Sequence, residues 1–101
     1  MNYYNIKNYF LVFLGIENSD EKKIAISNLS KIGDCVEIMK DGYVLTVISN
    51  KPVNINEVRE TAALGKNIVM VVRLESDLDA SWRLKTEKSQ FLDSIIKELN
   101  K

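Results

Sequence analysis

The chain has 101 residues, of which 46% are hydrophobic and 28% charged, and its 14 basic residues balance 14 acidic ones. This length is typical of one domain, and the apolar share is typical of a globular protein. A formal net charge of zero gives no electrostatic indication of a nucleic-acid or membrane-surface partner. The chain contains no histidine, which excludes any mechanism that uses imidazole as a base or as a metal ligand.

The single cysteine and the first apolar run both indicate a soluble cytoplasmic protein. Cys35 cannot form an internal disulfide and supplies too few ligands for a zinc site, so we expect a small buried side chain in a reducing compartment. The apolar run 9–16 leads into acidic residues without a small-residue cleavage site, unlike a signal peptide. It is also far shorter than the ~20 residues that a membrane span needs.

The first elements expected are a lead-in over residues 1–8, a strand over 9–16 and a helix that begins after Asn18. Continuous apolar residues in the strand predict burial on both faces, hence a central position in a sheet. Asn18 with Glu21 three positions later is a variant of the capping box, and Gly33 is expected to end the helix. The face of this helix toward the core comprises Ala25, Leu29 and Ile32, flanked by Ile24. The face toward solvent comprises Lys22, Lys23, Asn28 and Lys31.

Asp41 and Gly42 predict a two-residue hairpin turn between strands over 35–40 and 43–49. Such a turn pairs Lys40 with Tyr43, and it fixes the rest of the register. The further pairs expected are Ile38 with Leu45 and Val36 with Val47, which share one apolar face. The opposite, mixed face comprises Cys35, Glu37, Met39, Val44, Thr46 and Ile48.

The residues after the hairpin complete a βαββαβ order of elements. After Pro52, Asn54 caps a second helix with an apolar stripe that ends before Gly65, and residues 68–74 form the last strand. Right-handed crossovers place both helices on one face of the sheet. We therefore expect an α+β ferredoxin-like sandwich over residues 1–101, a single domain whose four-stranded antiparallel sheet has the first and third strands in the middle.

A C-terminal helix over residues 81–100 is expected, with Asp79 as its cap. A lone amphipathic helix must dock, either on the open face of its own sheet or in a homodimer that buries this face, and a combination of the two is favoured. Trp82 at the start of the helix is interpreted as an anchor, with Arg83 pairing with the acidic turn before it. The residues expected to anchor the helix or form the interface are Trp82, Arg83, Met39, Val44, Ile48, Phe91 and Ile95.

Few residues of the sequence indicate a catalytic, metal-binding or nucleic-acid-binding site. The acidic group Glu75, Asp77 and Asp79 is interpreted as a solvated turn rather than a metal site. Asp34 and Asp41 lie at opposite ends of one strand and cannot share an ion, which leaves Glu37 as the least explained carboxylate. The aromatic pattern of RNA-binding sheets, phosphate loops and dinucleotide motifs are all missing, so nucleic acid is not the expected partner.

The chain resembles small bacterial proteins labelled SinR-like. The resemblance rests on the layout of elements and on three short motifs, Leu29-Ser-Lys-Ile-Gly-Asp34, Glu57-Val-Arg59 and Ala80-Ser-Trp-Arg83. SinR-like proteins belong to the superfamily of the CRISPR-adaptation endoribonuclease-like proteins and the VapD toxins. The resemblance implies a ferredoxin-like subunit, usually a homodimer, and in the nuclease members a divalent metal held by an Asp at the end of the first strand. Gly15 stands at that position here, and the nearest carboxylate on the same face is Glu17.

Three hypotheses follow. The first is a non-catalytic homodimeric protein that acts through protein–protein contacts, in bacterial or phage defence. The second is a nuclease that uses Mg²⁺ or Mn²⁺ at a displaced acidic site formed by Glu17 and Glu37. The third is a regulatory domain that binds a small ligand in the dimer groove, which rests on fold analogy. The first hypothesis requires no cofactor.

Overall fold

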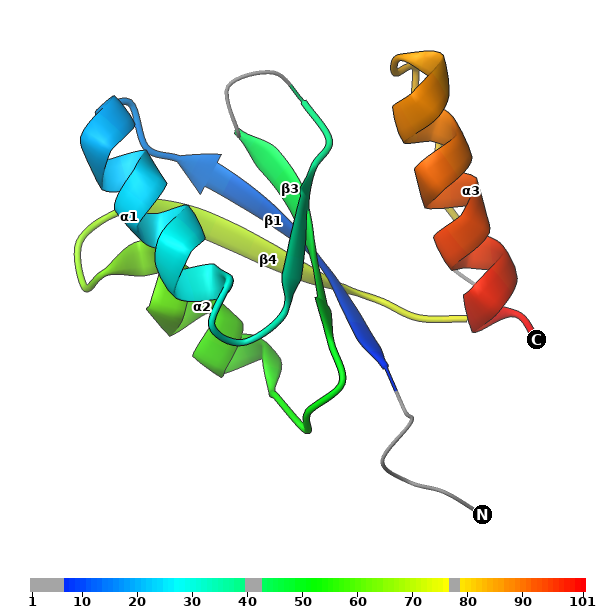
Figure 1. The fold of residues 1–101 in the computed structure, drawn as a ribbon, viewed down its shortest axis with the longest axis horizontal. Helices are drawn as coiled ribbons and strands as arrows, with labels where there is room; N and C mark the ends of the chain where they lie inside the picture. The colour runs from blue at the N-terminus through cyan, green and yellow to red at the C-terminus, as the bar shows by residue number, and fades with distance from the viewer. Residues whose placement is uncertain (1–6, 40–42, 77–78) are drawn as a thin grey trace.

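A computed structural model of the chain describes residues 7–39, 43–76 and 79–101 (Figure 1). Its elements are β1 (Asn8–Gly15), α1 (Ser19–Leu29), β2 (Asp34–Glu37), β3 (Val44–Ser49), α2 (Ile55–Ala63), β4 (Ile68–Leu74) and α3 (Thr86–Leu99). The expected hairpin turn at Asp41 and Gly42 lies outside the described residues, as does most of the lead-in.

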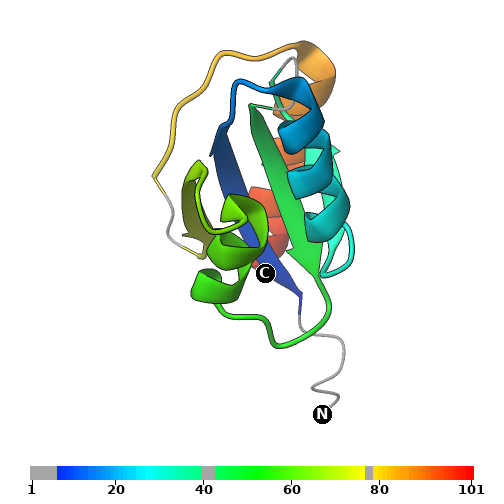
Figure 2. The same cartoon turned by 90° about the vertical axis from the view of Figure 1, so that its left-hand side faces the viewer.

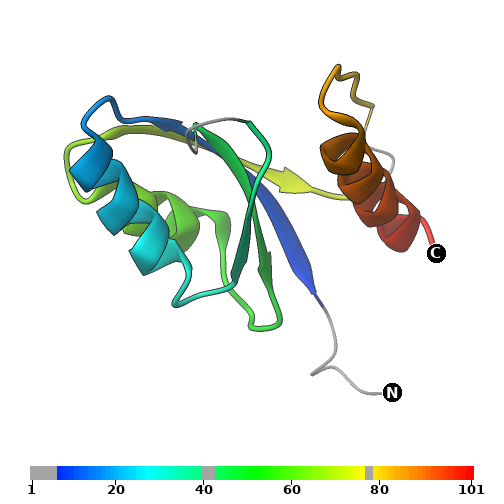
Figure 3. The ribbon, with the colours of Figure 1, turned by 45° about the horizontal axis from the view of Figure 1, so that its top comes forward.

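The four strands form one antiparallel sheet in the order β2-β3-β1-β4, so β1 and β3 are central as predicted. Helices α1 and α2 lie together against one face of this sheet, and α3 packs against the opposite face (Figures 1 and 3). The fold is the α+β ferredoxin-like sandwich that the sequence predicts, with α3 added at the C-terminal end.

Two apolar clusters on the two faces of β1 explain its unbroken apolar sequence. Phe10, Val12 and Leu14 are almost wholly buried against α1 and α2, in the larger cluster. Tyr9 points the other way and is buried in a second cluster together with Leu92 of α3. Alternate side chains of a strand point to opposite faces, so a central strand between two helical layers is apolar throughout.

The observed register of β2 differs from the predicted register by one residue. Cys35 pairs with Val47 and Val36 with Thr46, whereas the two-residue turn predicted Val36 opposite Val47. A shift of one residue moves every side chain of the strand to the other face. Cys35 therefore packs toward α1 and α2 in the larger cluster. Ile38 packs in the second cluster, so the faces assigned to β2 were wrong and those assigned to β3 were correct.

An extra residue at the end of β2 accounts for this shift. The backbone N–H groups of Ile38 and Met39 both donate to the carbonyl oxygen of Val44, at 2.8 and 3.2 Å. Two residues that share one partner form a bulge-like irregularity, which offsets the strand relative to the spacing of a regular two-residue turn.

Helices α1 and α2 begin where predicted. Asn18 and Asn54 each accept a hydrogen bond from the backbone N–H three residues later, at 3.0 and 2.9 Å. Two details of α1 differ from the prediction. The helix ends at Leu29 rather than at Gly33, and Lys22 is buried rather than on the solvent face, with its ammonium 3.6 Å from the centre of the Tyr43 ring.

Helix α3 begins at Thr86 rather than at residue 81, and it ends at Leu99. Residues 79–85 form an extended segment, so Asp79 does not cap the helix, and the N-cap residue Lys85 makes no side-chain cap hydrogen bond. Within this segment Trp82 and Leu84 are half-buried against the second cluster, while the residues between and beside them are exposed. Alternation of this kind is typical of an extended chain that lies across an apolar surface.

Candidate functional site

The largest exposed apolar feature among the described residues lies on β4. Ile68, Met70 and Val72 are 79%, 57% and 37% exposed, and they occupy alternate positions on the face of the sheet that α3 packs against. Leu74, the next residue of this row, is buried in the second cluster. Helix α3 thus reaches the end of β4 but leaves the rest of the row uncovered. We call Ile68, Met70 and Val72 the β4 stripe.

The edge formed by β4 is also unprotected. The strand pairs only with β1 among the described strands, and its seven residues contain one charged residue, Arg73. The opposite edge, β2, is only four residues long and carries exposed Asp34 and Glu37 at its ends. Short length and charges are the usual means by which proteins keep a sheet edge from pairing with another chain, whereas β4 is seven residues long and has its one charge next to its C-terminal end.

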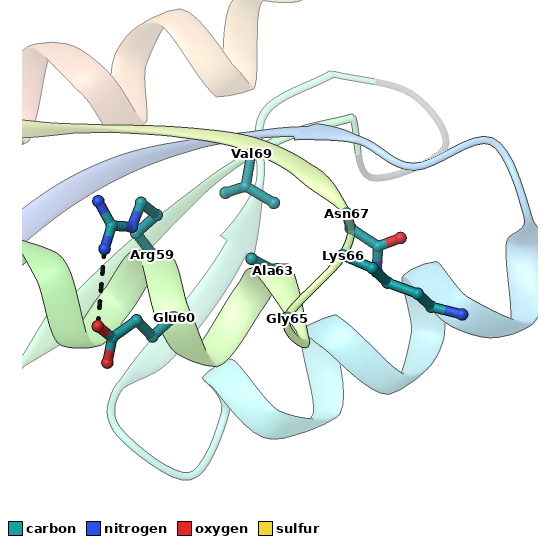
Figure 4. Close-up of a pocket in the computed structure, with 7 residues that line it drawn as sticks. All are labelled: Arg59, Glu60, Ala63, Gly65, Lys66, Asn67 and Val69. Carbon is teal, nitrogen blue, oxygen red and sulfur yellow. Dashed lines mark ion pairs between the residues drawn. The ribbon is translucent and has the colours of Figure 1, made fainter.

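A groove of about 420 Å³ runs beside this edge on the α2 side, as Figure 4 shows. Val69 lines it from β4, while Arg59 and Glu60 of α2 line the other wall and form an ion pair at 3.6 Å. Asn67 also lines it, and its side-chain nitrogen is buried without a hydrogen-bond partner in the described part of the chain. The groove therefore combines an apolar floor with charged and amide groups.

The two candidate carboxylates of the nuclease hypothesis are not brought together. Glu37 pairs with Leu45 of β3, which in turn pairs with Val12 of β1, whereas Glu17 lies five residues beyond Val12. The end of β1 at Gly15 is about 10 Å from Val12 along the strand, Glu17 lies two residues beyond that end, and two strand spacings of about 4.8 Å each separate β2 from β1. No three His, Cys, Asp or Glu residues within the described ranges are close enough to hold a metal ion.

Gly15, which stands where the resemblance stated above implies a metal-binding Asp in the nuclease members of that superfamily, is closely packed. A Cβ atom at Gly15 would lie 3.1 Å from the backbone oxygen of Ile68 and 3.3 Å from a methyl group of the same residue. Any side chain here requires a small shift at the start of β4. The glycine therefore fits the close approach of β1 and β4.

Trp82 and Arg83 lie in the extended segment rather than on a helix. Trp82 packs in the second cluster, and Arg83 is exposed. Arg83 lines a second groove, of about 490 Å³, between the end of β2 and the start of α3. Glu37 and the 48% exposed Met39 line the same groove, so three residues singled out from the sequence lie near one another there.

The remaining predicted interface residues contact α3 within the same chain or belong to it. Val44 and Ile95 are buried in the second cluster, and Ile48 and Phe91 pack against it half-buried. In a single chain these side chains are thus already covered by α3. Their part in an interface between copies stays a prediction.

Burial raises the pKa of two groups. The pKa of the Cys35 thiol is raised chiefly by burial and further by the nearby Asp34 carboxylate, while a hydrogen bond with Ser30 lowers it. The pKa of the Tyr9 hydroxyl is raised by burial and then by Glu98. A raised thiol pKa disfavours the reactive thiolate, which agrees with a packing role for Cys35.

The sequence indicated that one side of the first and last strands would stay open, but not which part of that face α3 would cover. The alternation of Trp82 and Leu84 could have indicated that the segment before α3 is extended rather than helical, but it does not locate the β4 stripe. No helix in the described part of the chain is long and apolar enough to cross a membrane. Comparison with protein-family models, with curated proteins and with solved structures finds no match.

Proposed function

We propose that this protein is a non-catalytic homodimer that acts through protein–protein contacts, with the β4 stripe and the β4 edge as its contact surface. The carrying observation is the exposure of Ile68 and Met70 beside a sheet edge that has no protecting charge at its middle. Contiguous apolar surface next to an unpaired strand is typical of an interface, because both the side chains and the backbone gain partners there. A role in bacterial or phage defence belongs to the same proposal through the resemblance to SinR-like proteins.

Substitution of Met70 by Lys tests the contact surface. The charged side chain would have to leave water on association, so we expect the dimer to weaken by at least tenfold, a change of about 1.4 kcal/mol. Ile24→Lys is the matched control, because Ile24 is 51% exposed but lies on α1, away from β4. Sedimentation velocity over a concentration series measures both variants. Equal association of the two variants would contradict the proposed surface.

The competing hypothesis is a metal-dependent nuclease, and it has a direct test. The full chain is incubated with single-stranded RNA and with DNA in Mg²⁺ and in Mn²⁺. The proposal expects no cleavage above that of a mock purification. Cleavage that Glu17→Ala or Glu37→Ala abolishes would replace the proposal with the nuclease hypothesis.

A further inference from the structure

The outward-facing backbone groups of β4 can be assigned from the register. Leu14 donates its backbone N–H to the carbonyl of Tyr43, which leads into β3, at 2.7 Å. Successive residues of a strand point these groups to opposite neighbours, so Phe13 and its partner Met70 point theirs toward each other. Every second residue of β4 therefore faces away from β1. The residues with outward N–H and C=O groups are Val69, Val71 and Arg73.

We propose that two copies of the chain pair antiparallel along this edge, with Val71 of one copy opposite Val71 of the other. The inference rests on the proposed function and specifies the partner and the register at that surface. A twofold axis beside Val71 joins the two sheets into one of eight strands and keeps α2 of both copies on the same face. This register uses all three outward residues, because Val69 then lies opposite Arg73 on each side of the axis. A register centred on Met70 would instead place Arg73 opposite Asn67, whose N–H already donates to Ala63.

The same register joins the two β4 stripes. Met70 of one copy lies opposite Val72 of the other, and Ile68 lies opposite Leu74. Residues directly opposite in an antiparallel pair have Cβ atoms about 5 Å apart, so their side chains are in contact. The most exposed apolar side chains of the described chain are thereby brought to one continuous strip across the axis.

Charges on the other face are complementary in this register. Arg73 of the second copy lies opposite Val69, beside the groove whose wall carries the Glu60 carboxylate. Within its own chain Arg73 has a hydrogen bond to Asn8 at 3.1 Å and a long ion pair with Glu75 at 3.9 Å. The two Arg73 residues are about 14 Å apart along the strands, so they do not oppose each other.

The ends of the strand are complementary as well. Continuing the register by one residue places Glu75 of the second copy opposite Asn67, which pairs a carboxylate with an amide. Lys66 then lies opposite Ser76, and its ammonium already pairs with Glu21 of its own chain at 2.9 Å, so Lys66 adds no charge pair between the copies. The Arg73–Glu60 and Glu75–Asn67 contacts each occur twice, once on either side of the axis, so the edge is self-complementary when it pairs antiparallel, and this favours a second copy as the occupant.

Cysteine cross-linking tests the register in the full chain, with Cys35→Ser as the background. Opposite residues have Cα atoms about 5.5 Å apart, which a disulfide can bridge. We expect Val71→Cys to form a covalent dimer under mild oxidation. Val69→Cys is the control, since the two copies of residue 69 are about 14 Å apart along the strands and should not cross-link.

A charge exchange provides a second readout. We expect Arg73→Glu and Glu60→Arg each to weaken the dimer by tenfold or more, and the double variant to recover most of the loss. Lys23→Glu, on the exposed surface of α1, is the control for a general effect of charge and should not change association.

The outcomes separate this inference from the function on which it rests. A monomeric unsubstituted chain would overturn both. A dimer in which Val71→Cys does not cross-link, and in which the double charge variant is as weak as the singles, would overturn the register alone. Cross-linking at Val69 in place of Val71 would do the same.

Discussion

Gly33 carries the tightest backbone approach of the described glycines. A Cβ atom there would lie 2.6 Å from the carbonyl oxygen of Ile48 and 2.9 Å from a methyl carbon of Val47. The nearest atom is backbone within the sheet, so it cannot move aside as a flexible side chain would. This glycine lets the chain leave α1 and enter β2 directly against β3.

We expect Gly33→Ala to lower the free energy of unfolding by about 1–3 kcal/mol, the usual cost of overpacking. Urea unfolding followed by circular dichroism measures the change. Gly65→Asn is the matched control: Gly65 has a φ of +79° with nothing within 4 Å of its Cβ position, and Asn tolerates that conformation. Equal stability of Gly33→Ala and the unsubstituted chain would contradict the close approach.

At the scale of elements, the features that depend on a few adjacent residues were predicted correctly. The Asn caps of α1 and α2 and the bounds of β4 could be predicted because each depends on a few adjacent residues. The register of β2 could not be predicted from the two-residue turn. It depends on the irregularity at which Ile38 and Met39 both donate to the carbonyl oxygen of Val44, and no short sequence pattern indicates this pairing. The start of α3 was misplaced because the helical pattern after residue 86 was extended backward over an alternating segment.

The docking of α3 depends on its extended lead segment as well as on the helix itself. Trp82 and Leu84 contact the second cluster before the helix begins, and Leu92 and Ile95 continue the contact from α3. Figure 2 shows residues 79–85 leading to the start of α3. The segment and the helix thus hold the second cluster together.

Trp82→Ala should lower the free energy of unfolding by about 2 kcal/mol, less than the ~3–5 kcal/mol typical of a fully buried aromatic, because the ring is half-buried. Thermal unfolding at equal protein concentration measures this change. Association should stay as in the unsubstituted chain. Unchanged stability with loss of the dimer would instead place Trp82 in the interface.

At the scale of the whole molecule, the two faces of the sheet are covered unequally. Helices α1 and α2 bury one face of the sheet. Helix α3 covers only the part of the other face that forms the second cluster, and it leaves the β4 stripe exposed. The sequence predicted an open apolar face, yet its position depends on where α3 docks, and no local pattern determines that. Glu17 and Glu37 are candidate metal ligands only because both are carboxylates, and the order of the strands in the sheet separates them.

The mass of the chain in solution tests the central claim most directly. Light scattering coupled to size exclusion, at tens of micromolar protein, should give about twice the 11.5 kDa of one chain. The mass should fall toward a single chain for Met70→Lys and stay doubled for Ile24→Lys. A mass of 11.5 kDa for the unsubstituted chain throughout the concentration series would contradict the account.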